Sequence, residues 1–166
     1  MLSQKETELK MKETDRIIKE LGKQIGGLGN SFGRFTEGLL GPSIRKILEE
    51  KFSAEYVVAR LGKKLNGEQI EIDYFGACNG NINKAFVVEV KTALELRDII
   101  QLKKAIKLLP QIMPEQKGKN VVGLIAAASY TEEQKKKVLE NGFYFLKITN
   151  EIAKLDVPKN FKPKIF

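Results

Sequence analysis

Residues 69–92 read QIEIDYFGACNGNINKAFVVEVKT. Residues 69–75 alternate between apolar and polar side chains, which is typical of a strand with one buried face. The dipeptide Asn79-Gly80 is a strong turn signal. Residues 85–91 are apolar until their last residues, which predicts another strand. The sequence therefore predicts two neighbouring strands joined by a hairpin.

Three charged side chains stand out in this hairpin. Glu89 and Lys91 project from the same face of the second strand, because side chains alternate along a strand. Two charges at the end of an apolar strand are costly to bury without partners, and Asp73 on the first strand supplies another carboxylate. Two carboxylates that converge repel each other unless a cation or a proton lies between them. The pattern predicts a site for Mg²⁺ or Mn²⁺, beside which Lys91 adds positive charge where a phosphodiester would lie.

The length of the turn decides whether these side chains meet. Directly opposed residues of an antiparallel pair share a face. A two-residue turn would pair Asp73 with Phe86 and would leave Glu89 on the opposite face. A loop centred on Asn81 would pair Asp73 with Glu89 directly. The site therefore requires a longer loop or a bulge near residues 79–83.

The elements around the hairpin predict a mixed α/β fold, in the order helix, three-strand meander, helix, strand, helix, strand, with an N-terminal helical extension. The predicted helices cover residues 3–25, 31–40, 42–52, 94–109 and 131–141, and the predicted strands cover 56–60, 69–75, 85–91, 121–128 and 143–148. Gly41-Pro42 is expected to interrupt one helix and Pro110 to end another. The tail beyond Pro158 is expected to be loose.

The amino-acid composition excludes several kinds of catalytic and metal site. The chain has 29 basic and 21 acidic residues, a formal charge of +8, no histidine and one cysteine. The missing histidine excludes Ser-His-Asp and Cys-His catalysis, and a single thiol excludes a disulfide within the chain and a Cys/His zinc site. Positive charge favours a nucleic-acid partner. The longest apolar run, residues 121–128, is too short to cross a bilayer, and no signal-peptide pattern is found, so we expect a cytoplasmic protein without a membrane partner.

Asp73, the hairpin and Glu89-Val90-Lys91 resemble the PD-(D/E)XK nuclease superfamily, to which restriction endonucleases and archaeal Holliday-junction resolvases belong. The order of elements over residues 30–128 agrees with that superfamily's core of helix, three strands, helix and strand. More narrowly, residues 33–39 after a charged helix resemble a group of uncharacterised bacterial proteins with an N-terminal coiled-coil helix. The resemblance implies a restriction endonuclease-like fold with a mixed central sheet flanked by helices. One departure is Ile72, which stands where the nominal motif has proline.

The resemblance also implies roles for individual residues. Asp73 and Glu89 resemble the metal-binding carboxylates, and the Val90 carbonyl would add a ligand. Lys91 resembles the residue that orients the nucleophilic water, and Glu37 resembles an acidic residue of the first helix. The implied activity is hydrolysis of phosphodiester bonds, in DNA rather than RNA, by a water that Mg²⁺ or Mn²⁺ activates.

Four residues on the helix after Lys91 are weaker candidates for contact with nucleic acid. Some branches of the superfamily carry Gln followed four residues later by Tyr, but here Ala105 follows Gln101. Gln101 is kept as a candidate beside three lysines, Lys103, Lys104 and Lys107. A solvated helix face is the plainer explanation of such lysines. In the same way, a cross-strand salt bridge on a solvated sheet face is the plainer explanation of Asp73, Glu89 and Lys91.

The predicted organisation has three parts: a helix over residues 1–28, a nuclease-like domain over 29–150 and a tail over 151–166. The first part has an apolar seam, with Met11, Ile18 and Ile25 at one heptad position and Thr14, Leu21 and Leu28 at the other. This seam predicts a homodimer, although a helix folded back on the core would have a similar pattern. The alternative function is a catalytically silent nuclease-fold module that binds nucleic acid or assembles through this helix.

The heptad seam predicts the oligomeric state of the chain, which light scattering measures as a molar mass. We expect the whole chain to run as a dimer in light scattering, and a chain that begins at Ser31 to run as a monomer, because the shorter chain lacks the seam. If both run as monomers, the coiled-coil hypothesis is wrong.

Overall fold

The computed structural model describes residues 13–14, 16–18, 20–21, 24 and 38–166. The chain divides into two compact units, Met1–Phe35 and Thr36–Phe166. In the first unit every described residue is helical, as the sequence predicts. Of the seam residues, Ile18 and Leu21 are 63% and 52% exposed, whereas Met11, Ile25 and Leu28 lie outside the described residues.

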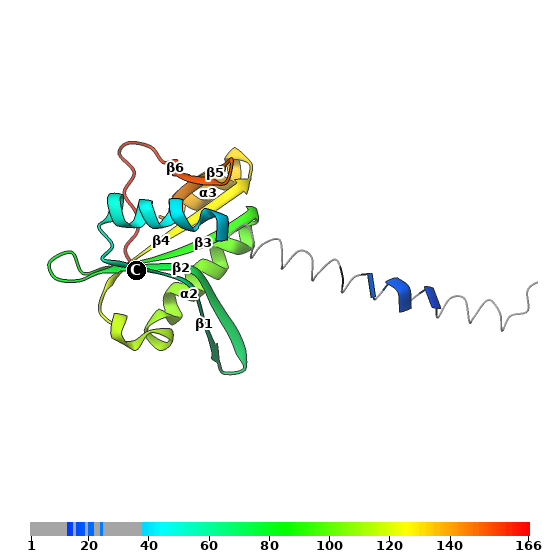
Figure 1. Ribbon diagram of the computed structural model, residues 1–166. Coiled ribbons are helices and arrows are strands. Elements are labelled where there is room, and N and C mark those ends of the chain that lie inside the picture. Colours follow the sequence, from blue (N-terminus) through cyan, green and yellow to red (C-terminus); the bar gives the residue numbers. More distant parts are fainter. Residues whose placement is uncertain (1–12, 15, 19, 22–23, 25–37) are drawn as a thin grey trace, which may run out of the picture. The chain divides into compact units, whose positions relative to one another are not determined.

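The second unit is built on a six-stranded mixed sheet with helices on both faces (Figure 1). In spatial order the strands are β1 (Tyr56–Leu65), β2 (Glu68–Cys78), β3 (Lys84–Ala93), β4 (Asn120–Ser129), β5 (Tyr144–Thr149) and β6 (Ile152–Leu155). Strands β3, β4 and β5 are parallel, and the other neighbouring pairs are antiparallel. The helices are residues 38–46 with the π-helical turn η1 (Ile47–Lys51), α2 (Leu96–Ile112), the 3₁₀ turn η2 (Pro114–Gln116) and α3 (Glu132–Glu140). The predicted α/β fold is confirmed.

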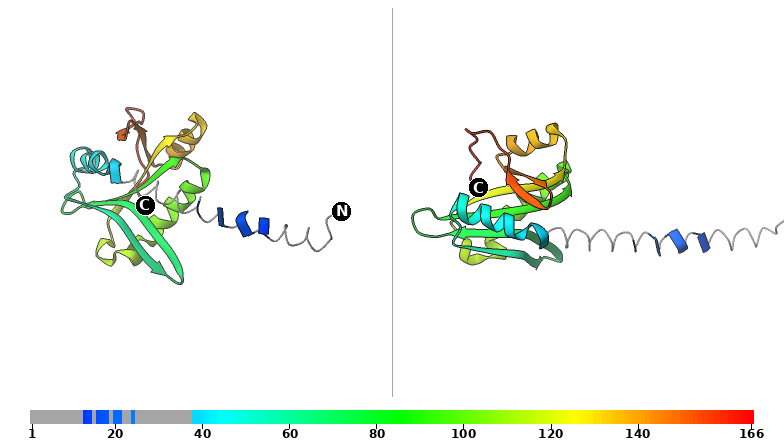
Figure 2. Two further views of the ribbon diagram at one scale, coloured as in Figure 1. Left: turned by 45° about the vertical axis from the view of Figure 1, so that its right-hand side comes forward. Right: turned by 45° about the horizontal axis from the view of Figure 1, so that its top comes forward.

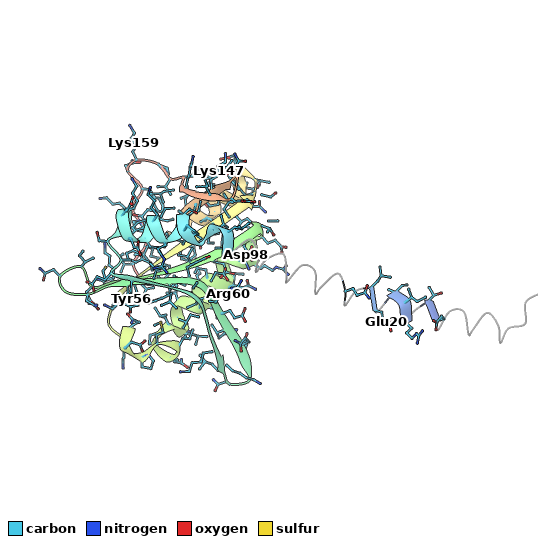
Figure 3. All side chains as sticks on the ribbon, viewed as in Figure 1. Glu20, Tyr56, Arg60, Asp98, Lys147 and Lys159 are labelled. Carbon is cyan, nitrogen blue, oxygen red and sulfur yellow. The ribbon has the colours of Figure 1, made fainter. Side chains whose placement is uncertain are left out.

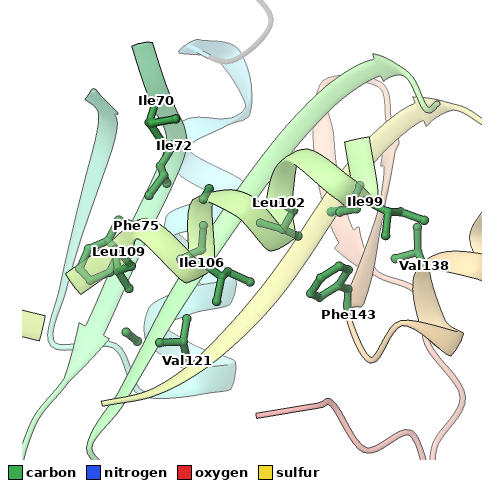
Figure 4. Packing of buried hydrophobic residues seen from close by; sticks show 14 of the residues in the cluster. Ile70, Ile72, Phe75, Ile99, Leu102, Ile106, Leu109, Val121, Val138 and Phe143 are labelled. Atoms are coloured by element: carbon green, nitrogen blue, oxygen red, sulfur yellow. The ribbon is translucent and has the colours of Figure 1, made fainter. Parts of the chain in front are cut away.

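Each face of the sheet has its own hydrophobic core. Under α2 and α3, Leu102 and Leu109 pack with Phe75 and Phe143 (Figure 4). The helix of residues 38–46 and the turn η1 cover the opposite face with a second cluster, as the two views of Figure 2 show. Strand β4 contributes to both clusters, which explains why its residues form a nearly continuous apolar run. No helix in the described part of the chain is long and apolar enough to cross a membrane.

Two prolines lie inside helices, contrary to the prediction that they end or interrupt them. Pro42 follows Gly41 within one continuous helix, and the carbonyl that loses its partner belongs to residue 38, which is exposed to water. Pro110 lies in the last turn of α2, which continues to Ile112. Because each proline removes only one hydrogen bond of its helix, packing of the buried face outweighs the local preference.

The C-terminal tail is also ordered differently from the prediction. Strand β6 pairs with β5, and Phe166 exchanges two backbone hydrogen bonds with Val121 at 3.1 and 3.0 Å. The Phe166 ring stacks on Phe143, with 5.4 Å between ring centroids. Strand β5 pairs with β4 only from Leu124 onward, so Phe166 occupies the edge of β4 that β5 does not reach. The expectation of a loose tail beyond Pro158 is wrong.

The tail contact makes a prediction about stability. Phe166→Ala should lower the free energy of unfolding by about 1–2 kcal/mol, because a half-buried ring is lost from the Phe143 stack. Urea unfolding measures the change, with Ile165→Ala as the matched control, since Ile165 is 44% exposed. Equal effects of the two substitutions would contradict the packing of the tail.

Candidate active site

The β2–β3 register meets the condition that the predicted site requires. Tyr74 pairs with Val88, Cys78 pairs with Lys84, and residues 79–83 form the loop between the two strands. Continued by one residue, this register places Asp73 opposite Glu89. Opposed residues share a face of the sheet, so a loop of this length is the one that the predicted site requires.

Asp73 marks the point at which β2 leaves β3. The ladder ends at Tyr74, and beyond it the Asp73 carboxylate accepts a hydrogen bond from the Val90 N–H at 2.6 Å. The side chain therefore takes the place of the Ile72 carbonyl, which a regular ladder would set opposite Val90. Ile72 and Phe75 both pack under α2, although a regular strand would place them on opposite faces. The strand thus turns over at Asp73.

The β1–β2 hairpin changes direction at the same level. Its ladder includes Ala59 with Tyr74 and Leu61 with Ile72, but it omits the intervening pair of Arg60 and Asp73. Arg60 has a φ of +56°, an uncommon conformation for a residue with a side chain. The outer half of the hairpin projects beyond the rest of the sheet (Figure 2). Arg60 is exposed, and by the count of residues along the two strands it stands opposite Asp73.

Lys91 joins the carboxylates into a network. Its Nζ lies 2.7 Å from Glu89 Oε1 and 3.6 Å from Asp98 Oδ1 in the first turn of α2. The side chains of Lys91, Glu89 and Asp98 are 29%, 12% and 5% exposed. Asp98 also accepts a hydrogen bond from the Glu95 N–H at 2.7 Å, which fixes its position at the start of α2 (Figure 3). The network is shielded on the α2 side and reaches water at the lysine.

The pKa of Lys91 is raised. Burial alone would lower it, but attraction by Glu89, a hydrogen bond to that residue, and attraction by Asp98 and Asp73 together outweigh the burial. Lys91 is therefore a cation at neutral pH. Because its folded-state pKa is raised, its pairing stabilises the fold below the ordinary lysine pKa of about 10.4, and this contribution is lost as pH rises through the raised value.

The other predicted residues lie outside this network. Lys103 donates a hydrogen bond to Asn141, and Lys104 forms an ion pair with Glu68 at the start of β2. Lys107 and Gln101 are exposed on α2. Gln101 lies one helical turn beyond Asp98. Of the four candidates on α2, it is therefore the nearest along the helix to the Lys91 network. Glu37 lies outside the described residues.

Sequence reasoning missed two residues of this site. Asp98 forms a capping box with Glu95, and the Glu-x-x-Asp spacing is a signal for one. The signal for Arg60 is the Asn66-Gly67 turn, across which Leu65 pairs with Glu68. Counting five residues away from the turn along each strand sets Arg60 opposite Asp73. Both signals are present in the sequence.

Residues 42–155 match the family described as "Domain of unknown function (DUF8196)". The chain belongs to this family. The DUF8196 domain contains Asp73, Glu89, Lys91 and Asp98, and it begins after Glu37.

Among solved structures, the chain is similar to a repair endonuclease from Pyrococcus abyssi, with 23% identity and a TM-score of 0.44 over 65% of this chain and 46% of that chain. It is also similar to a structure described as the EndoMS-dsDNA2 complex, with 19% identity and a TM-score of 0.39 over 66% of this chain and 44% of that chain. The chain thus covers less than half the length of either. A search of the curated proteins finds no match.

The buried carboxylate of Asp98 makes a prediction about stability. Asp98→Asn should lower the free energy of unfolding by about 1–2 kcal/mol, because Lys91 loses one of its partners while the amide oxygen still caps α2. Urea unfolding at neutral pH measures this. Glu115→Gln is the control, since Glu115 is an exposed acid outside the network. No difference from this control would show that the Lys91 contact contributes nothing to folding.

Proposed function

We propose that this chain is a metal-dependent nuclease that hydrolyses phosphodiester bonds in nucleic acid, with DNA as its substrate. The observation that carries the proposal is the β2–β3 register, which would set Asp73 opposite Glu89 if it continued by one residue. Lys91 Nζ lies 2.7 Å from Glu89. A register shifted by one residue would separate these groups onto two faces of the sheet.

The donor atoms suit Mg²⁺. Mg²⁺ is commonly held by one or two carboxylates and keeps several waters for the rest of its coordination shell. Asp73 and Glu89 supply two carboxylates. In a strand the N–H and C=O of one residue point to the same side, so the Val90 carbonyl faces the Asp73 side together with its N–H. Among the described residues no group of three or more His, Cys, Asp or Glu side chains is arranged to hold a metal ion, so the proposed set is two carboxylates, one carbonyl and water.

Each residue then has a defined task. Asp73 and Glu89 would hold the metal, which would supply charge at the phosphoryl oxygens and lower the pKa of water. Lys91 is the cation that stabilises the anionic nucleophile or the phosphodiester, and its raised pKa keeps it charged. Asp98 positions Lys91 from the α2 side. Lys91 does not serve as a general base in this scheme, because it carries a proton at neutral pH.

The charge of the chain supports a polyanionic substrate. Its formal charge is +8, and a positive protein surface attracts nucleic acid by releasing counterions. Arg60 lies beside the proposed site, and Lys63 and Lys64 follow it on the projecting hairpin. A phosphate backbone that approaches the carboxylates from this side would meet these cations. The choice of DNA rests on the resemblance to restriction endonucleases and Holliday-junction resolvases.

The test is cleavage of labelled single- and double-stranded DNA and RNA with Mg²⁺, Mn²⁺ or EDTA. The natural chain is expected to cut with a metal ion and not with EDTA. Asp73→Asn, Glu89→Gln and Lys91→Met should each reduce the rate by at least about 100-fold, the scale of losing one charge-stabilising group. Glu71→Gln is the matched control, since Glu71 is an exposed acid two residues before Asp73, and it should cut normally.

The outcomes separate the nuclease from its alternative. Cutting that persists in all three variants would come from another site or from a contaminant, and would overturn the proposal. Salt-sensitive binding without cutting would favour a catalytically silent nuclease-fold module.

A further inference from the structure

A cavity of about 350 Å³ opens on the opposite face of the sheet from the Lys91 network. It lies where η1 ends, beside the starts of β3, β4 and β5 and the C-terminal tail. Six of its lining residues carry the argument: three aromatic rings, Phe52, Phe86 and Tyr144, and three polar side chains, Lys51, Ser53 and Lys84. From Lys84 to Lys91 is about 23 Å along β3, so the cavity is separate from the proposed active site.

The aromatic rings form one continuous group. The Phe52 centroid lies 5.2 Å from that of Phe86 and 4.9 Å from that of Tyr144. Phe86 is buried beneath this group, and the partly exposed Phe52 and Tyr144 rings can contact an aromatic ligand. Such contacts tolerate different heterocycles because each has a π-face. Burial raises the pKa of Tyr144, so its hydroxyl remains a hydrogen-bond donor at neutral pH. The cavity is therefore lined by two partly exposed rings, Phe52 and Tyr144, which are tilted by 58° to each other, and it has one phenolic donor.

The polar residues give the cavity a positive charge. Its lining includes Lys51 and Lys84 and no carboxylate. In the described part of the chain neither ammonium group forms a salt bridge, whereas Lys91, Lys104 and Lys135 each do. Two unpaired cations and the Ser53 hydroxyl beside one hollow favour an anion with several acceptor oxygens.

We propose that this cavity binds a phosphate monoester joined to an aromatic heterocycle, as in a nucleoside monophosphate. Phe52 and Tyr144, which are partly exposed, contact the heterocycle, and Lys51, Lys84 and Ser53 bind the phosphate. The volume is near the lower end of ligand pockets, which suits one nucleotide rather than two. The nucleotide is either free or the 5′-phosphorylated end of a strand. This inference goes beyond the proposed nuclease function and does not depend on it.

The test is isothermal titration and amide NMR of the whole chain in EDTA, so that no metal-dependent reaction contributes. The probes are AMP, adenosine, inorganic phosphate, and a short DNA strand with or without a 5′-phosphate. AMP or the 5′-phosphorylated strand should bind at least about tenfold more tightly than adenosine, phosphate or the unphosphorylated strand, since each of these lacks half of the recognised group. Binding of AMP identifies a free nucleotide, and binding of the phosphorylated strand alone identifies a strand end.

Variants assign the site. Lys51→Gln with Lys84→Gln should weaken binding at least about tenfold through the loss of two charge-assisted contacts. Lys51→Gln alone should weaken the binding several-fold. Because Lys51 is exposed, this single variant should fold and can replace the double variant if that one does not fold. Lys147→Gln is the control, because Lys147 is an exposed lysine of β5 that does not line the cavity (Figure 3).

Four results would overturn the proposal. The first is no binding of AMP or of the phosphorylated strand at about 2 mM, a concentration far above ordinary nucleotide affinities. The second is equal binding of phosphate alone, and the third is unchanged binding in the double variant. The fourth is a set of amide shifts confined to residues near Glu89, which would place the ligand elsewhere. None of these results depends on whether the chain cuts nucleic acid, so the two proposals fail separately.

Discussion

The hydrogen bond from the Val90 N–H to the Asp73 carboxylate holds the point at which two strands part. Strand β2 must leave β3 there, because the outer half of the β1–β2 hairpin projects beyond the sheet. An unpaired backbone N–H at that position would cost free energy, and the Asp73 carboxylate at 2.6 Å satisfies it. The same bond fixes a carboxylate opposite Glu89. One side chain thus closes the end of a ladder and supplies half of the proposed metal site.

Charge balance governs the residues around this bond. Burial disfavours the Lys91 ammonium, and only the surrounding carboxylates keep its pKa raised. Conversely, Glu89 and Asp98 are nearly enclosed and rely on Lys91 for neutralisation. A divalent cation bound by Asp73 and Glu89 would compete with Lys91 for Glu89. The contact with Glu89 thus holds the lysine close to the proposed metal site, where its positive charge would stabilise the phosphodiester.

Local signals in the sequence predict most of the second unit. Thr131 and Gln134 form the capping box that starts α3, and the period-two and apolar runs mark β2, β3 and β4. The errors occur where tertiary packing outweighs a local preference, as at the two helical prolines and in the tail that follows Pro158. Nothing in residues 158–166 indicates that Phe166 completes the edge of β4, since that edge exists only after β5 has stopped short.

By itself, the sequence determined the residue types and their spacing along each strand: Asp73 before the turn, and Glu89 and Lys91 together at the end of an apolar run. Residue alternation is a local property, so one strand suffices to place Glu89 and Lys91 on one face. The meeting of Asp73 with Glu89 depended on the loop of residues 79–83, and the enclosure by Asp98 depended on how α2 packs. Only the tertiary structure decided these, because register and helix docking are set by contacts between residues distant in the chain.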